Sequence, residues 1–285
     1  MTIQAAGAPI LPVAHSCTPS PRFTSLPEPC FESSGKPRRP RLADGTWRAL
    51  LLVLKLGCLG AVLSVVLRAP RPFDERRHPK EAGGWPSSTL EWLHPMAHLW
   101  LIYLWASSCL DISTLLVNSS GAATEPGFRN PLLASRSLRE AWGDRWNRPV
   151  HVLLKRSVYV PARRRGLSAT SAAIVTFFAS GLLHEYNFSI HNASAYEPGR
   201  ASLFFLLMGS LMLLEVAALP AFNKLLPRHA RELFHATPSA IIALGLQVLV
   251  LPAFAPLFMR SWVGSGMIEA VGSMVLHAHC DDRAD

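Results

Sequence analysis

Long apolar runs constrain this chain more than any other feature of its sequence. Five stretches, residues 49–67, 95–117, 167–190, 202–219 and 239–259, approach the roughly 20 residues that a helix needs to cross a bilayer. Apolar residues make up 49% of the 285 residues and charged residues only 16%, which is unusual for a soluble domain. Because a backbone inside lipid must satisfy its own hydrogen bonds, such runs form helices. The sequence therefore predicts an all-α polytopic membrane protein with about five transmembrane helices.

The two ends of the chain differ in composition from this membrane region. Residues 1–45 are rich in Pro, Ser and Ala and end in a basic run, which is typical of a disordered tail. Residues 46–262 form the predicted membrane domain. Residues 263–285 hold an apolar piece too short to span a bilayer, followed by a terminal tail. The five cysteines lack paired spacing, and the histidines beside Cys280 lack a second ligand pair, so we expect neither disulfides nor a metal site.

The positive charge is concentrated in one loop. Residues 121–167 contain ten Lys and Arg against three acidic residues, whereas Arg200 is the only Lys or Arg between the third and fourth apolar runs. The positive-inside rule then places the basic loop in the cytoplasm. Membrane topology explains the formal charge of +9 without a nucleic-acid partner.

The basic loop also carries a helical pattern. Between residues 135 and 154, apolar residues recur at three- and four-residue steps, at Leu138, Trp142, Trp146, Val150 and Leu153. This spacing predicts an interfacial amphipathic helix. Gly143 and Pro149 weaken it, so we expect irregular backbone around Asn147, of the kind tolerated at membrane depth where a segment lines a cavity.

Ionisable residues inside the apolar runs are the candidates for function. His184 and Glu185 lie near the end of the third run, and Asp111 and Glu215 lie in the second and fourth. A charge at bilayer depth costs a few kcal/mol, so these side chains line a cavity, pair with a partner or do chemistry. The residue type alone leaves His184 open between a structural hydrogen bond and catalysis. Asp111 and Glu215 either line a chamber or pair with Lys55 or His184.

Three short motifs resemble a known family. Residues 130–138 (NPLLASRSL) and 141–147 (AWGDRWN) are similar to the P-x-x-A-x-S-L-x-x-F-W-G-R-R-W-N signature of the wax synthase branch of the membrane-bound O-acyltransferases. Residues 158–163 (VYVPAR) and 180–185 (SGLLHE) resemble that family's V-Y-x-P-V-R and S-G-L-M-H-E. Order and spacing agree over residues 128–185, and the pattern of apolar runs and loops from 95 to 259 fits as well, so the resemblance predicts a wax synthase-like core at 95–262. Ala141 stands where the family has an aromatic residue and Asp144 where it has a basic one.

The resemblance implies an O-acyltransferase of the endoplasmic reticulum membrane. Such an enzyme moves a fatty acyl group from acyl-CoA, a co-substrate, to a long-chain alcohol, with no cofactor. His184 would be the general base and Asn147 the second catalytic polar residue. Trp142, Trp146 and Glu185 would bind substrate, although membrane anchoring for the tryptophans and a structural role for Glu185 are alternatives. Arg145 and Arg148 would hold the phosphates of coenzyme A or, alternatively, anchor the loop.

Other interpretations compete with this one. A sterol or diacylglycerol is an equally suitable acceptor on sequence grounds. A catalytically silent family member that binds lipid is a second alternative, supported by Asp144 and the short amino-terminal region. A proton-coupled transporter would explain the buried ionisable residues but not the motif of residues 141–147.

Overall fold

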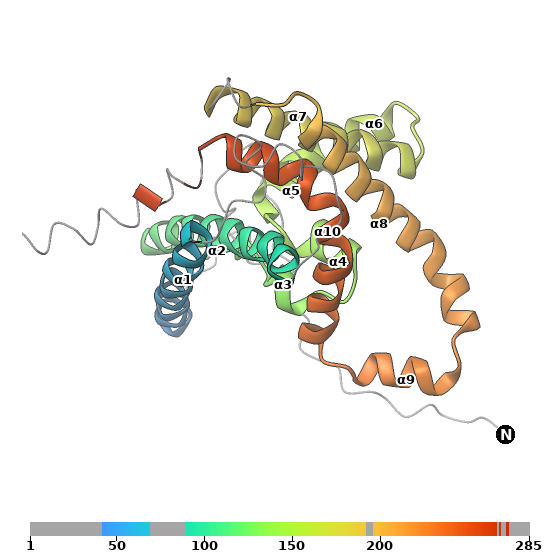
Figure 1. The fold of residues 1–285 in the computed structure, drawn as a ribbon, viewed down its shortest axis with the longest axis horizontal. Helices are drawn as coiled ribbons and strands as arrows, with labels where there is room; N and C mark the ends of the chain where they lie inside the picture. Colours follow the sequence, from blue (N-terminus) through green and yellow to red (C-terminus); the bar gives the residue numbers. More distant parts are fainter. Residues whose placement is uncertain (1–41, 69–88, 192–195, 267, 269–271, 274–285) are drawn as a thin grey trace, which may run out of the picture.

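The chain forms a bundle of helices in the computed structural model, which describes residues 42–68, 89–191, 196–266, 268 and 272–273 (Figure 1). Long helices dominate this part of the chain: α1 (Leu42–Arg68), α2 (Thr89–Ser119), α7 (Ala169–His191), α8 (Arg200–Leu225) and α10 (Ser239–Gly264). Short helices connect them: α3 (Pro131–Ala134), α4 (Leu138–Glu140), α5 (Arg148–Leu154), α6 (Val160–Arg164), α9 (Arg228–Ala236) and the π-helices η1 (Ala141–Arg145) and η2 (Lys155–Tyr159). The predicted all-helical class is confirmed.

The five predicted apolar runs coincide with the five long helices, but fewer than five of these helices meet the length and hydropathy of a membrane span. Three windows of the described residues are long and apolar enough to cross a membrane: Gly45–Leu67, His94–Ser119 and Arg200–Phe222. A fourth results if α9 and the first half of α10, which meet at 101°, form one broken span. A count of five is therefore not confirmed. In α7 the apolar sequence is interrupted by Ser, Thr, His184 and Glu185, which lower its hydropathy.

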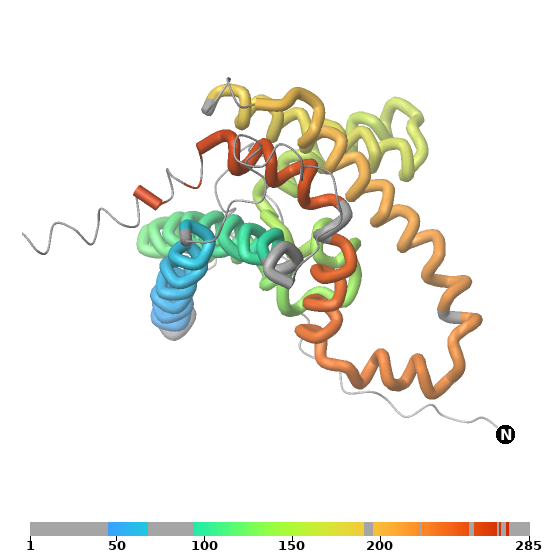
Figure 2. The backbone as a smooth tube through the Cα atoms, in the orientation of Figure 1, coloured from blue at the N-terminus to red at the C-terminus, as the bar shows by residue number. Residues whose placement is uncertain are grey.

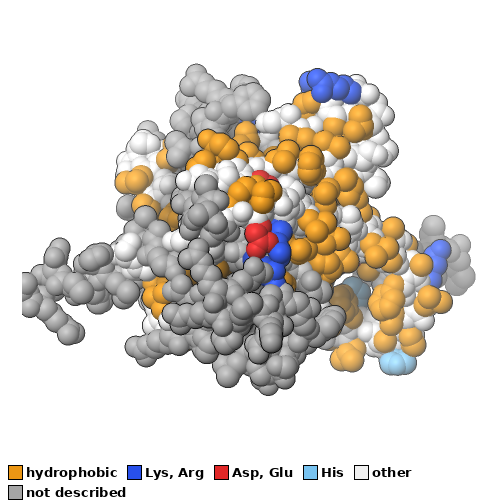
Figure 3. Space-filling view, turned by 45° about the horizontal axis from the view of Figure 1, so that its top comes forward, with side chains coloured by type: hydrophobic (Ala, Val, Ile, Leu, Met, Phe, Trp, Pro, Cys, Tyr) orange, Lys and Arg blue, Asp and Glu red, His pale blue; other side chains and the backbone are white. Residues whose placement is uncertain are grey.

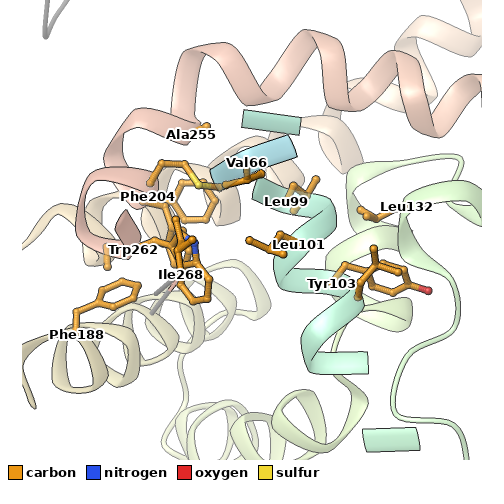
Figure 4. Packing of buried hydrophobic residues seen from close by; sticks show 14 of the residues in the cluster. Val66, Leu99, Leu101, Tyr103, Leu132, Phe188, Phe204, Ala255, Trp262 and Ile268 are labelled. Atoms are coloured by element: carbon orange, nitrogen blue, oxygen red, sulfur yellow. The ribbon is translucent and has the colours of Figure 1, made fainter. Parts of the chain in front are cut away.

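Two helix pairs and one crossing helix build the core. α1 packs along α2, α7 packs along α8, and α10 contacts α2, α3 and α8. Figure 2 shows that α8 leads away from α7 to α9, which turns the chain back into α10. Buried apolar side chains from α1, α2, α7, α8 and α10 form one cluster, and Figure 4 shows part of it, including Phe204 of α8 and Trp262 of α10.

The outward faces of these helices are apolar. Val53 of α1, Leu214 of α8 and Leu249 of α10 are each more than half exposed. Apolar side chains cover much of the described surface in Figure 3. Such a surface suits contact with lipid tails.

An ion pair joins α1 to α2 inside the apolar region. The Lys55 ammonium contacts the Asp111 carboxylate, and both side chains are largely buried. The ammonium also lies 5.9 Å from the centre of the Tyr103 ring. Pairing of Asp111 with Lys55 was one of the two alternatives predicted, and it is confirmed. Glu215 instead accepts hydrogen bonds from the backbone N–H groups of Leu138 and Arg139, at 3.1 and 2.9 Å, and so fixes the start of α4 to α8.

The basic loop is not one amphipathic helix but a series of short ones. After η1 the backbone leaves the helical region at Trp146, and Asn147 adopts a left-handed conformation (φ 37°, ψ 65°) before Pro149 enters the first turn of α5. The irregular backbone predicted around Asn147 is confirmed. The apolar side chains of this segment turn inward to line a cavity, because the breaks allow α4, η1 and α5 to curve around it.

The predicted ends of the chain lie mostly outside the described residues. This holds for nearly all of the tail at 1–45, since α1 begins at Leu42, and for most of the segment at 263–285. The histidines beside Cys280 also fall outside the described part.

Removing one partner of the Lys55–Asp111 pair should destabilise the protein more than removing both. Asp111→Leu leaves an unpaired ammonium among apolar side chains, and we expect a loss of about 3 kcal/mol in the free energy of unfolding. The double variant Lys55→Met, Asp111→Leu should recover most of that loss. Thermal unfolding of the purified protein in detergent measures both. A double variant less stable than the single one would contradict an ion pair in this position.

Candidate active site

A cavity of about 380 Å³ lies at the centre of the described residues. Its walls come from α2, the segment from Phe128 to Val150, and helices α7, α8 and α10. Most lining side chains are aromatic or aliphatic, and the polar exceptions include Asn147 and His184. A concave apolar space with a few convergent polar groups is the usual form of a ligand site. The structure thus brings together the two residues that the motifs single out, although they are 37 positions apart in the sequence.

The His184 ring is held in one orientation by its own helix. Its Nδ1 lies 2.8 Å from the carbonyl oxygen of Ser180, one turn earlier in α7. Because a carbonyl only accepts, Nδ1 carries the proton, and in the neutral ring Nε2 keeps a free lone pair. The ring lies against Phe205, with centroids 4.4 Å apart, and beside Phe258 at 5.6 Å. The remaining nitrogen is therefore presented as a base within an aromatic wall of the cavity.

A close helix contact sets the position of that ring. A Cβ at Gly181 would lie 2.6 Å from the Cα of Ser202, so only glycine allows α7 and α8 to approach this closely. Glu185, four residues later, accepts a 2.8 Å hydrogen bond from the backbone N–H of Ser202 in the first turn of α8. A carboxylate at a helix N-terminus is favourable because it meets unpaired N–H groups and the positive end of the helix dipole. The close backbone contact at Gly181 and the hydrogen bond of Glu185 therefore hold α7 against α8, before and after His184 in the sequence.

Glu185 has a second partner, the hydroxyl of Tyr196 in the segment before α8. This hydrogen bond raises the pKa of Tyr196 to about 12, so its hydroxyl remains a donor at physiological pH. Glu185 is buried but is not among the residues that line the cavity. These contacts support the structural role that the sequence left open for Glu185, and its predicted contact with substrate stays a prediction.

Asn147 lies where the chain breaks between η1 and α5. Its backbone is left-handed, a conformation that Asn tolerates better than most residues, and its side chain makes no capping hydrogen bond to α5. Two backbone hydrogen bonds hold the flanking residues to the segment 127–129: Arg129 N–H to Arg145 O at 3.0 Å, and Arg148 N–H to Gly127 O at 2.8 Å. The Asn147 carboxamide therefore does not cap α5. It lies at the cavity wall, on a backbone held by hydrogen bonds to the segment 127–129.

Trp142 and Trp146 form part of the same wall. Their rings lie 5.2 Å apart, and Trp142 reaches Phe205, the residue that packs on His184. Trp146 packs on Tyr103 and Phe128. Both tryptophans line the cavity. Their contact with substrate stays a prediction.

The predicted phosphate-binding arginines lie outside the cavity lining and already have acidic partners. Arg145 contacts Glu140 and donates a 2.9 Å hydrogen bond to the carbonyl of Arg129. Arg148 pairs with Asp144 at 3.0 Å and with Glu125 at 3.5 Å. Asp144, which departs from the family pattern, thus serves as a partner for Arg148. Contact of these arginines with substrate stays a prediction.

Other cavity residues were not found by sequence reasoning. Phe205 and Phe258 shape the wall at His184, and Gln247 lines the cavity from α10. Nothing in the local sequence separates these side chains from ordinary apolar helix residues. Packing of α8 on α7 brings Phe205 to the site, and the crossing of α10 over α2 and α8 brings Phe258 and Gln247 there.

The fold and site define a polytopic membrane protein whose apolar chamber is lined by a histidine ring and an asparagine side chain. Residues 124–207 match the membrane bound O-acyl transferase family. This match confirms the resemblance to the family that the motifs indicate.

Curated relatives come mainly from one branch of this family. The chain is 37% identical to the probable long-chain-alcohol O-fatty-acyltransferase 7 of Arabidopsis thaliana over 47% of its own length and 40% of that protein. It is 30% identical to the probable long-chain-alcohol O-fatty-acyltransferase 8 of the same plant, over 65% and 52% of the two chains. Identity to diacylglycerol O-acyltransferase 1-1 of rice (Oryza sativa subsp. japonica) is 25%, over 71% and 36%. The chain thus spans about half the length of these relatives, or less.

Substitution of Gly181 tests the helix contact that positions His184. Gly181→Ala should push α7 away from α8, because the added Cβ would overlap the Ser202 backbone, and should lower the unfolding temperature in detergent. Gly245→Ala is the matched control, since a Cβ there meets nothing within 4 Å. It should be neutral or stabilising by up to about 1 kcal/mol. Equal unfolding temperatures for the two variants would contradict the close contact.

Proposed function

We propose that this protein transfers a fatty acyl group from acyl-CoA to the hydroxyl of a long-chain alcohol or a related lipid. The observation that carries the proposal is the His184 ring, with its Nδ1 bound to Ser180 O at 2.8 Å, in an apolar chamber that Asn147 also lines. The family match and the names of the Arabidopsis relatives support the same reaction. We place the activity in the endoplasmic reticulum membrane.

His184 acts as the general base in this proposal. Nε2 removes the proton of the acceptor hydroxyl as its oxygen attacks the thioester carbonyl and forms a tetrahedral oxyanion. When the intermediate collapses, the carbon–sulfur bond breaks and the imidazolium returns the proton to the coenzyme A sulfur. The hydrogen bond from Nδ1–H to Ser180 O persists through both steps and stabilises the imidazolium. The ring therefore ends each cycle in its starting protonation state.

Asn147 stabilises the developing negative charge. Its carboxamide is free of capping duty and sits at the cavity wall, where its N–H groups suit an oxyanion. Because its backbone is held at both sides by the segment 127–129, the amide needs little reorganisation during the reaction. An alternative role, orienting the thioester, uses the same amide and the same position.

The chamber suits lipid chains and admits few polar groups. Its aromatic and aliphatic walls match an acyl chain and a long-chain alcohol, and they exclude water that would hydrolyse the thioester. The rice diacylglycerol acyltransferase among the relatives keeps diacylglycerol in consideration as acceptor. Feeding straight-chain alcohols, sterols and diacylglycerol to membranes that contain the protein, and identifying the esters, separates these acceptors.

Neither alternative function explains the site as well. A silent lipid-binding member would not need a His184 tautomer that leaves Nε2 unprotonated, nor an Asn147 amide in the same chamber that caps no helix. A proton relay would need connected ionisable groups, yet Asp111 pairs with Lys55, Glu185 binds Ser202 and Glu215 binds the start of α4.

His184→Ala and Asn147→Ala should each abolish most ester formation. Loss of the base should cost a factor of about 10² to 10⁴, and loss of the amide a factor of about 10² to 10³. The measurement is ester analysis in a host that makes no neutral lipids, with equal protein amounts in the membrane. His229→Ala, on the exposed face of α9, is the control and should behave like the original protein. Full activity in His184→Ala would overturn the proposal.

Asp144→Asn should improve acyl-CoA binding if Arg148 contacts the coenzyme A phosphates. The acid now pairs with Arg148 and competes with phosphate for it, so its neutralisation should lower the KM for acyl-CoA a few-fold. The change should shrink in high salt, because exposed charges are screened. Glu232→Gln, which removes a similar partner from Arg228 on α9, is the control. A higher KM in Asp144→Asn would contradict phosphate binding by Arg148.

A further inference from the structure

Gln247 is the polar side chain of α10 that lines the chamber, and one of its atoms has no partner. The side chain is only 7% exposed. Its Nε2 donates to the carbonyl of Leu132 at 2.7 Å and to that of Ala243 at 3.1 Å. Because both of these carbonyl oxygens can only accept, the nitrogen of the Gln247 amide must face them. Oε1 is then the polar atom of the side chain that is left without a partner. Among the described residues no donor reaches Oε1, which is buried.

An unpaired buried acceptor is costly. Leaving such a group without a hydrogen bond costs about 1–3 kcal/mol, and an apolar residue at this position would avoid the cost. The position is otherwise suited to an apolar side chain, since Leu246 and Val250 beside it also line the chamber. A ligand that brings a donor into the chamber would remove the penalty.

Gln247 lies some distance along the chamber from the reacting histidine. Phe258, which packs on His184, is 11 residues further along α10. At 1.5 Å per residue, the two positions are separated by roughly 16 Å along the helix axis. The Gln247 end is tied to Leu132 in the loop that the charge pattern places in the cytoplasm, the side from which acyl-CoA arrives.

We propose that Gln247 is a substrate-binding residue whose Oε1 accepts a hydrogen bond from an N–H or O–H group of a substrate that reacts at His184. This inference rests on the proposed acyl transfer and adds a polar contact remote from the reacting carbonyl. The pantetheine arm of acyl-CoA carries two amide N–H groups and a hydroxyl, each of which loses water on entering an apolar chamber. An acceptor lipid with a second hydroxyl carries the same chemistry. A simple long-chain alcohol has no second donor.

Equilibrium binding to the purified full chain tests this contact with ligands that cannot react. One pair is hexadecyl-CoA, a thioether, and its analogue with both pantetheine amides replaced by esters. The other pair is 1,2-hexadecanediol and 1-hexadecanol. Each ligand is measured with the original protein, with Gln247→Met and with Leu246→Met, a control that changes the lining without removing a polar atom. Gln247→Asn, which withdraws the oxygen, is a second variant should the first not fold.

The original protein should bind the donor-bearing member of one pair about tenfold more tightly. That ratio should fall to about one in Gln247→Met and persist in Leu246→Met. The thioether pair identifies the pantetheine arm as the source of the donor, and the diol pair identifies the acceptor lipid. Equal affinities within both pairs in the original protein, or an unchanged ratio in the Gln247 variants, would overturn the proposal. Because the ligands do not react, the ratio is independent of turnover, and missing ester formation with an intact ratio would contradict acyl transfer alone.

Discussion

The contact between α7 and α8 at Gly181 is the constraint on which the rest of the site depends. Glycine removes the side chain that would separate the two backbones, and the Glu185 carboxylate then reaches the N–H of Ser202 at the start of α8. Within lipid, such close packing and interhelical hydrogen bonds replace the hydrophobic effect as the source of association. The same contact places His184 against Phe205, so the motif SGLLHE specifies a close helix contact as well as the histidine that we propose as the base.

The second half of the site depends on a broken backbone. A continuous helix through residues 135–154 would carry its tryptophans along one straight stripe. The left-handed Asn147, the π-helix before it and Pro149 after it instead curve the segment around the chamber. Backbone groups on both sides of this break form hydrogen bonds with the segment 127–129. These bonds avoid the free-energy cost of unpaired backbone groups in an apolar environment. The irregular backbone and the amide that we propose as the oxyanion donor therefore occur at the same residue.

The sequence predicted the parts of this structure that depend on local pattern. Apolar runs of membrane length gave the five long helices, and Gly143 with Pro149 gave the break at Asn147. Pairing of Asp111 with Lys55 was one of the arrangements left open by the cost of burying a charge. What the pattern does not contain is which helix crosses which. The partners of Glu185 and Glu215 on neighbouring elements, and the lining residues Phe258 and Gln247, follow from tertiary packing, which no short motif specifies.

The central claim is that His184 and Asn147 face the reacting thioester inside one chamber. The most direct measurement is an experimental structure of the protein with bound hexadecyl-CoA, whose thioether sulfur marks the position of the thioester. The account predicts that this sulfur lies within roughly 4 Å of His184 Nε2, that Asn147 lies on the same side, and that the alkyl chain occupies the apolar chamber. An alkyl chain bound elsewhere, with His184 still enclosed only by its aromatic neighbours, would contradict it.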